Sequence, residues 1–270
     1  YIYEASGLKL AIPKEYKDLL LTDSHHEQNS RSLFRVREKA SVEAAMRYGS
    51  DFNGLGWLFS IGTLDEEHLH QKLCGDMSGI EIFAKDSDGN YYAYYHPTDV
   101  RYHRKTPNEM KKDQEQWAML NEWAWKSVRK NFIRDNPQLA PITFDNSIVG
   151  IYIARIMYDQ RINYSVSTLK HGPVAPKNID PAPYLEKLLC NASYDMVPDS
   201  ETPDGEYAVI AFPEENCRLD FFLMPGKENY VRHVIKDEGA VLFKASYEDK
   251  SILAGKAVKE WYDALAADSE

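Results

Sequence analysis

Short apolar runs separated by turn signals make up most of the first half of the chain. Runs rich in β-branched, aliphatic and aromatic residues predict strands there. These strands are expected at residues 8–12, 32–36, 56–61, 80–84 and 91–95. Asp88-Gly89 lies between the last two runs, and this dipeptide tolerates the positive φ angles of a tight hairpin turn.

Two segments of the first half have the pattern of helices. Residues 66–73 follow Asp65, a good N-cap, and carry acidic residues in the first turn. Residues 108–132 repeat apolar side chains at i, i+3 and i+4, which predicts a stripe that faces the core. The stripe consists of Trp117, Leu120, Ala124, Val128 and Phe132. Trp123 and Trp125 lie off it and are expected to cover the sheet from its other side.

The second half predicts more strands than helices. Strands are expected at residues 142–144, 151–157 and 164–168, followed by a meander at 207–212, 219–224, 230–235 and 240–245. Residues 184–189 and 252–265 read as helices. Strands joined by hairpins, rather than alternating βαβ units, predict an α+β fold with mainly antiparallel sheet and packed helices.

Several residues of the first half recur in the same order in the second half. Cys74, Asp88-Gly89, Tyr91 and Pro97 recur 116 positions later as Cys190, Asp204-Gly205, Tyr207 and Pro213. We therefore predict two tandem pseudo-repeats, an internal duplication with residues 1–136 and 137–270 as the copies and a hairpin in each. The link between the copies is short, so separate domains and one shared sheet both stay open.

The predicted strand at 91–95 differs from its counterpart in the second copy. Tyr92, Tyr94 and His96 share one face, where the second copy has Ala208, Ile210 and Phe212. Phenol and imidazole rings combine flat apolar area with a polar tip, which suits a half-exposed binding surface. Tyr92, Tyr94 and His96 are thus the predicted ligand-binding residues. The alternative is that a neighbouring helix covers them and each hydroxyl finds a hydrogen-bond partner.

Composition narrows the classes of function. The chain has 270 residues, 43% of them hydrophobic, and a formal charge of −10 that is spread along the sequence. Because phosphate contacts need clustered Lys and Arg, nucleic acid and anionic membrane surfaces are disfavoured as partners. No run of about twenty apolar residues predicts a transmembrane segment.

The three cysteines do not form a recognisable framework. Cys74, Cys190 and Cys217 are far apart and lack C-x-x-C spacing. Three buried thiols, or one disulfide and one spare thiol, both stay open. Cys74 and Cys190 each follow a leucine at the end of a short predicted helix, so both are expected to be buried as small apolar residues.

No metal site or cofactor is predicted. Residues 86–90 resemble the start of a calcium loop, but glycine stands at the fourth loop position and Pro97 where a bidentate Glu is needed, so a hairpin turn explains them. His68 and His70 point about 200° apart on a helix. His25-His26 lies in a polar stretch that reads as a loop.

One group of residues has the composition of a catalytic site. His96, Asp99, Arg101 and His103 lie close in sequence, and a His paired with a carboxylate can act as a general base. No G-x-S-x-G, P-loop or G-x-G-x-x-G motif accompanies them. We therefore predict no catalytic residues.

Three segments resemble those of uncharacterised secreted lipoproteins from Gram-positive gut bacteria. They are GWLFSI at residues 56–61, DGNYYAYYHPTDVR at 88–101 and PDGEYAVIAFP at 203–213. The resemblance implies export, a secreted or cell-surface location and a lipid anchor. The first residue is Tyr1 rather than a methionine, so we expect that a preceding segment such as a signal peptide was removed, and the lipid anchor would belong to that segment. Residues 7–13, GLKLAIP, are also similar to the first strand of the PsbP/Mog1-like fold.

Two classes of function follow from these observations. The first is a non-catalytic extracellular or cell-surface binding or scaffold protein of unknown ligand. The second is an extracellular hydrolase acting on glycan or peptide through His96, Asp99 and glutamates of the second copy. A shallow aromatic surface favours the first, and a deep pocket joining paired carboxylates favours the second.

Overall fold

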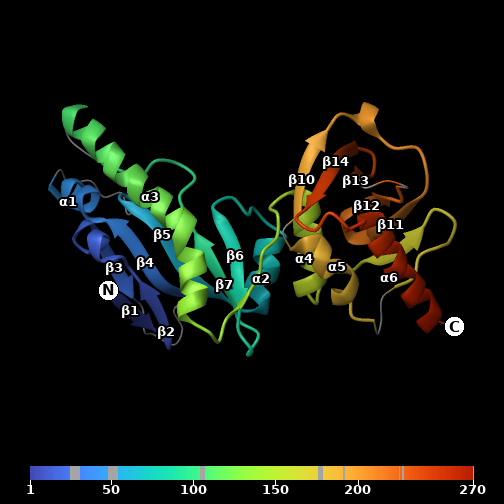
Figure 1. Cartoon of the computed structure of the whole chain (residues 1–270), viewed down its shortest axis with the longest axis horizontal. Helices are drawn as coiled ribbons and strands as arrows, with labels where there is room; N and C mark the ends of the chain where they lie inside the picture. The colour runs from blue at the N-terminus through green and yellow to red at the C-terminus, as the bar shows by residue number, and fades with distance from the viewer. Residues whose placement is uncertain are drawn as a thin grey trace. The chain divides into compact units, whose positions relative to one another are not determined.

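The chain divides into two compact units, Tyr1–Ile142 and Thr143–Glu270 (Figure 1). The structure is a computed structural model and describes residues 1–24, 31–47, 54–103, 107–175, 179–190, 192–224, 226 and 228–269. The boundary falls at Ile142 rather than at 136, because β8 (Ala140–Pro141) pairs with β6 (Ile80–Lys85) and keeps the segment after Asn136 in the first unit.

In its described residues, the first unit is a six-stranded antiparallel sheet with three α-helices and a separate N-terminal hairpin. Its strand order is β3-β4-β5-β7-β6-β8. Besides β6 and β8, the sheet contains β3 (Leu20–Ser24), β4 (Ser32–Glu38), β5 (Trp57–Leu64) and β7 (Tyr91–Tyr95). The hairpin is β1 (Ile2–Ala5) and β2 (Leu8–Ala11), followed by the 3-10 helix η1 (Lys14–Leu19). The helices are α1 (Lys39–Arg47), α2 (Glu66–Leu73) and α3 (Pro107–Asp135).

Helix α3 supplies one wall of the first core and runs along the sheet (Figure 1). The predicted stripe is confirmed, since all five of its residues are buried. Phe132 makes edge contacts with Phe34 of β4 and Phe83 of β6. Trp123, predicted to lie on the other side of the sheet, instead contacts Phe59 of β5 in the same core. Helix and sheet therefore enclose a single apolar layer.

The buried amide of Asn136 ties the end of α3 to the N-terminal hairpin. Its Oδ1 accepts the backbone N–H of Lys9 at 2.8 Å, and its Nδ2 donates to the carbonyls of Lys9 and Phe132 at 2.8 and 2.7 Å. The amide side chain thus pairs with the backbone of Lys9 as the backbone of a neighbouring strand would. Three satisfied hydrogen bonds explain how a polar residue is 2% exposed at this position.

The part of the second unit that the structure describes is also a six-stranded antiparallel sheet with three α-helices. Its strand order is β10-β14-β13-β12-β11-β9. The strands are β9 (Ser165–Thr168), β10 (Ala192–Val197), β11 (Tyr207–Phe212), β12 (Cys217–Phe222), β13 (Asn229–Ile235) and β14 (Gly239–Tyr247). The helices are α4 (Ile148–Tyr158), α5 (Ala182–Leu189) and α6 (Ala254–Asp268), with short 3-10 turns η2 (Asp199–Glu201) and η3 (Pro213–Glu215). The α+β class and the predicted meander β11 to β14 are confirmed.

The predicted strand at 151–157 is wrong, because this segment forms α4. Ser147 caps the helix by accepting the N–H of Gly150 at 3.2 Å. A Cβ at Gly150 would collide with the carbonyl of Asp145, so glycine permits the tight entry. Seven of the eleven helix residues are buried. Hydrophobic periodicity cannot distinguish such a buried helix from a buried strand, and the β-branched residues favoured the wrong choice.

The two units share one strand pairing but differ in the next. Ile61 of β5 lies opposite Tyr94 of β7, and Val166 of β9 lies opposite Ile210 of β11, as the sequence echo requires. The hairpin is not repeated. β6 pairs with β7, whereas β10 pairs with β14 at the far edge of the second sheet. The predicted second hairpin is wrong, and the structure does not confirm the duplication.

Among the described residues, no helix combines the length and the apolar character needed to cross a lipid bilayer.

Candidate functional site

Two of the three predicted binding residues lie inside the first unit. Tyr92 is 6% exposed and Tyr94 is 1% exposed. The prediction of a half-exposed tyrosine face is therefore wrong, and the alternative of a covering helix applies, with a hydrogen-bond partner shown for the hydroxyl of Tyr92. Tyr94 stacks on Phe59 with ring centroids 5.4 Å apart, under α3. Recognition through Tyr92, Tyr94 and His96 stays a prediction, but only His96 keeps a partly exposed side chain.

The hydroxyl of Tyr92 is used to fix the β6–β7 turn. It donates to Asp86 Oδ2 at 2.9 Å. Asp86 Oδ1 also accepts the backbone N–H groups of Asp88 and Asn90, each at 2.9 Å. Burial alone raises the pKa of Asp86, but these hydrogen bonds outweigh it and hold the pKa below its ordinary value. The carboxylate is thus committed to the hairpin, as the sequence reading of residues 86–90 expected.

A cluster at the edge of α3 extends from Tyr94 to the surface. We call Glu81, His96, Trp125 and Arg129 the Trp125 cluster. The guanidinium of Arg129 lies 5.1 Å from the ring centroid of Tyr94 and 4.6 Å from that of Trp125. Trp125 is 44% exposed. The cluster therefore connects the buried ring of Tyr94 with the exposed indole of Trp125.

The indole of Trp125 is held from two directions. His96 approaches it edge to face, with centroids 4.7 Å apart and planes at 82°. Arg129 stacks on it and donates from Nη2 to the Trp125 carbonyl at 2.6 Å. Arg129 is itself paired with Glu81, which lies opposite Tyr94 in the sheet. Partial burial lowers the pKa of Arg129, yet a guanidinium stays charged at any physiological pH.

The group considered for catalysis does not assemble as a His–carboxylate pair around His96. The ring of His96 contacts Trp125, and its Nδ1 lies 3.2 Å from the Pro97 carbonyl. Asp99 pairs instead with Arg101 at 2.5 Å, and its side chain is 60% exposed. The backbone N–H of His103 donates to Ser41 Oγ at 3.1 Å. His96 therefore belongs to an aromatic surface.

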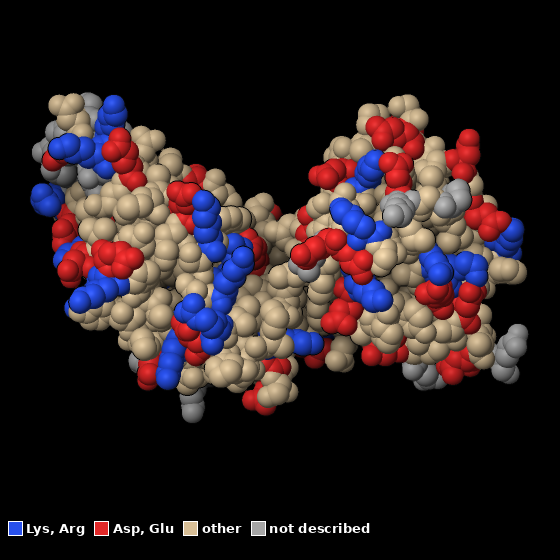
Figure 2. Space-filling view, in the orientation of Figure 1, with Lys and Arg blue, Asp and Glu red and all other residues tan. Residues whose placement is uncertain are grey.

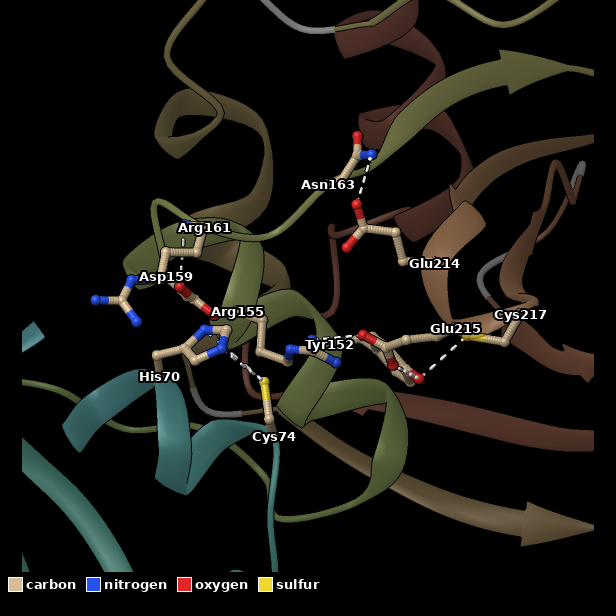
Figure 3. Close-up of polar contacts among 10 residues, drawn as sticks. All are labelled: His70, Cys74, Tyr152, Arg155, Asp159, Arg161, Asn163, Glu214, Glu215 and Cys217. Carbon is tan, nitrogen blue, oxygen red and sulfur yellow. Dashed lines mark hydrogen bonds and ion pairs between the residues drawn. The ribbon is translucent and has the colours of Figure 1, made fainter. Parts of the chain in front are cut away.

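The second unit holds a polar network between α4 and β12, in which Tyr152, Arg155 and Cys217 are buried and Glu215 is exposed (Figure 3). The thiol of Cys217 donates to the hydroxyl of Tyr152 at 3.1 Å, and that hydroxyl donates to Glu215 Oε2. Arg155 Nη2 pairs with Glu215 Oε1 at 2.5 Å. Next to this network, His233 packs against the ring of Tyr152 with centroids 5.7 Å apart. Sulfur, phenol, carboxylate and guanidinium thus form one chain.

Electrostatics make this network structural rather than nucleophilic. Burial raises the pKa of the Cys217 thiol, so the thiolate that attacks electrophiles is disfavoured. Burial alone raises the pKa of Glu215, but hydrogen bonds from Arg155 and Tyr152 lower it below the ordinary value. Burial lowers the pKa of His233 and so favours its neutral form. The network links helix to sheet and keeps its sulfur protonated.

Two hollows of the second unit differ from the pocket that a hydrolase requires. One, of about 270 Å³, is lined by Phe222, Leu223, Met224, Glu228, Asn229, Leu253 and Lys256. The other has the same volume and includes the carboxylates of Glu228 and Asp249. Hydrogen bonds from Lys244 and Ser251 respectively lower the pKa of each carboxylate. A glycosidase needs one carboxyl group with a raised pKa, so this pair does not match that chemistry.

The cysteines differ in exposure, and none forms a disulfide. Cys74 is exposed and Cys190 is half-buried, so the expectation that both are buried is wrong. Cys74 ends its helix at the surface, whereas Leu188 and Leu189 pack the end of α5 into the core.

The predicted loop at His25-His26 lies outside the described residues.

Sequence reasoning missed the partners that make the Trp125 cluster. The signal was present as i, i+4 spacing between Trp125 and Arg129, which places both on one helix face. Glu81 could not be found in this way, because its position opposite Tyr94 depends on the strand register.

No family model, no curated protein and no solved structure matches the chain. On the face of the molecule in Figure 2, Lys and Arg lie interspersed with Asp and Glu among the described residues.

Proposed function

We propose that the protein is a non-catalytic binding protein that is secreted or held at the cell surface, and that it contacts its ligand through the Trp125 cluster. One observation carries the proposal. A tryptophan that is 44% exposed is fixed by a stacked guanidinium and an imidazole edge instead of being buried. Tryptophan offers large contact area with few rotatable bonds, so a held indole binds at low entropic cost.

The chemistry of the cluster restricts the ligand. Arg129 is neutralised by Glu81, so the surface has no unbalanced charge with which to select an ion. A ligand with a flat apolar face and neutral polar groups fits best, such as a sugar ring or an aromatic peptide side chain. The resemblance of residues 56–61, 88–101 and 203–213 to secreted lipoproteins supports the extracytoplasmic location.

A glycan and peptide array tests the proposal. We expect the purified chain to bind members with exposed ring faces, and Trp125→Ala to weaken binding by about thirtyfold, the size of an interface hot spot. Met119→Ala is the matched control, because Met119 lies on the same helix and is 42% exposed. Equal binding by the wild type and Trp125→Ala would show that the Trp125 cluster is not the binding site. No binding to any member of the array would contradict the proposed binding function.

The location has its own test. Fractionation of the native cells should place the chain in the culture medium or the cell-surface fraction. Recovery only from the cytoplasm would overturn this part of the proposal without affecting the Trp125 cluster.

A further inference from the structure

The end of α2 brings an imidazole next to an exposed thiol. His70 and Cys74 are four residues apart, so their side chains leave the helix on the same side. The Sγ of Cys74 lies 3.9 Å from both Nδ1 and Nε2 of His70. Two different metal-ligating groups thus meet at one point of the surface.

The separation is close to that of two ligands on one metal ion. Zinc binds thiolate sulfur at about 2.3 Å and imidazole nitrogen at about 2.0 Å, which puts the two atoms about 3.5 Å apart at a tetrahedral angle. Because both ring nitrogens are equally distant from the sulfur, a turn of the ring about its Cβ–Cγ bond suffices to direct one of them. That torsion is soft in histidine.

The position in the helix also favours a cation. Cys74 is the C-cap of α2, where unpaired carbonyl groups give the helix end a partial negative charge. The other histidine of this helix is engaged elsewhere. The ring of His68 contacts Asp65 at the N-terminal end. Of the two histidines of α2, His70 is thus the one that lies beside the thiol.

We infer that His70 and Cys74 form a binding site for a borderline-soft divalent cation, with Zn²⁺ as the best fit. Thiolate together with imidazole is a ligand pair that zinc prefers over hard oxygen-binding ions. Two protein ligands leave two tetrahedral positions for water or for a group from another molecule. The inference is independent of the proposed binding surface, since it involves none of the residues of the Trp125 cluster.

Cys190 provides an internal control. It follows α5 as Cys74 follows α2, but the residue four positions before it is Glu186. Burial and the charge of Glu186 raise the pKa of the Cys190 thiol, with a smaller opposing effect from Thr143. A half-buried thiol beside a carboxylate is a poorer soft-metal site than an exposed thiol beside an imidazole.

The experiment measures alkylation of each cysteine in the full chain by peptide mass spectrometry, with and without Zn²⁺. Bound zinc occupies the thiolate that the alkylating reagent needs, so we expect labelling of Cys74 to slow by about tenfold or more and that of Cys190 to stay unchanged. The protection should disappear in His70→Gln and persist in His68→Gln.

Two results would overturn the site. One is an unchanged labelling rate at Cys74 in saturating Zn²⁺, and the other is equal protection in the wild type and His70→Gln. If His70→Gln fails to fold, Co²⁺ added to the wild-type chain decides. A thiolate-to-cobalt charge-transfer band that Cys74→Ser abolishes supports the site, and its absence refutes it.

Discussion

Strand β7 of the first unit and strand β11 of the second have the same pairing with a neighbouring strand but bury different chemistry. Ile61 faces Tyr94, and Val166 faces Ile210. Tyr94 is 1% exposed and Ile210 is fully buried. A change from aliphatic to phenol rings at such a position therefore does not indicate exposure. It indicates that a different helix, α3 with Phe59 instead of α6, fills the space above the strand.

At β7 and β11 different residues are equally buried, whereas at the ends of α2 and α5 identical residues are buried to different extents. Their cysteines are the same residue type in the same place after an eight-residue helix, yet Cys74 is exposed and Cys190 is half-buried. The difference lies in the residues around them. Leu188 and Leu189 anchor the end of α5 in the core, whereas α2 ends with Lys72 and Leu73, of which only Leu73 is buried. Position in a motif does not determine burial.

Truncating the two matched core residues tests the first comparison and has the largest expected effect. Tyr94→Ala should lower the free energy of unfolding of the first unit by about 3–5 kcal/mol, as for other buried aromatic residues. Ile210→Ala should cost the second unit about 2–5 kcal/mol. Each change should leave the other unit unaffected, because each residue is buried within its own unit.

Tryptophan fluorescence can follow the first unit during denaturation, since Trp57, Trp117, Trp123 and Trp125 lie there and only Trp261 lies in the second. Calorimetry can resolve the second transition. A Tyr94→Ala protein with unchanged stability would mean that Tyr94 is not core, and would restore the exposed tyrosine face as a binding surface.

These outcomes bear on how much the sequence could predict. Helix α2 was predicted with its exact limits because Asp65 is a strong local N-cap, and its Oδ1 does accept the N–H of His68. The turn at Asp88-Gly89 was likewise local. The burial of Tyr94 was not, since it depends on where α3 packs. The identity of α4 also depended on burial from all sides, which short-range patterns do not contain.

Thiol reactivity tests the second comparison with the next largest effect. Cys74 should react fastest, Cys190 more slowly and Cys217 slowest. Cys217 is 8% exposed and bonded to Tyr152. Between Cys74 and Cys217 we expect a ratio on the order of a hundredfold, as for a group that reacts only after local opening of about 3 kcal/mol. Labelling followed by peptide mass spectrometry measures all three. Faster reaction of Cys190 than Cys74 would contradict the contrast between the helix ends.

Removing single hydroxyl groups should separate the two buried tyrosines of β7. Tyr92→Phe loses a hydrogen bond to the Asp86 carboxylate and should cost about 1.5 kcal/mol. Tyr94 has no such bond to a described residue, so Tyr94→Phe should change the stability by less than about 0.5 kcal/mol. Both values come from denaturant unfolding followed by tryptophan fluorescence. Equal costs would mean that the Asp86 contact does not stabilise the turn.

Mild acid should distinguish the units by the smallest effect. Burial lowers the pKa of His233, so below a pH of about 6.5 the imidazole takes up a proton more readily in the unfolded chain than in the folded second unit. The unfolded state then binds more protons, and stability falls as the pH drops from that value. Glu215 extends the loss at lower pH, because its pKa is lowered and its pairing with Arg155 ends when it is protonated.

His233→Gln should remove the first part of this acid sensitivity and leave the second. Glutamine does not titrate, so the melting temperature of the second transition should stay level from pH 7 down to about pH 4, where carboxylates of the unfolded chain begin to take up protons. The wild type should already decline across that interval. Calorimetry at a series of pH values measures both proteins. If the wild-type transition is level as well, His233 is accessible to protons in the folded state, and the polar network of the second unit is more open than that of a buried core.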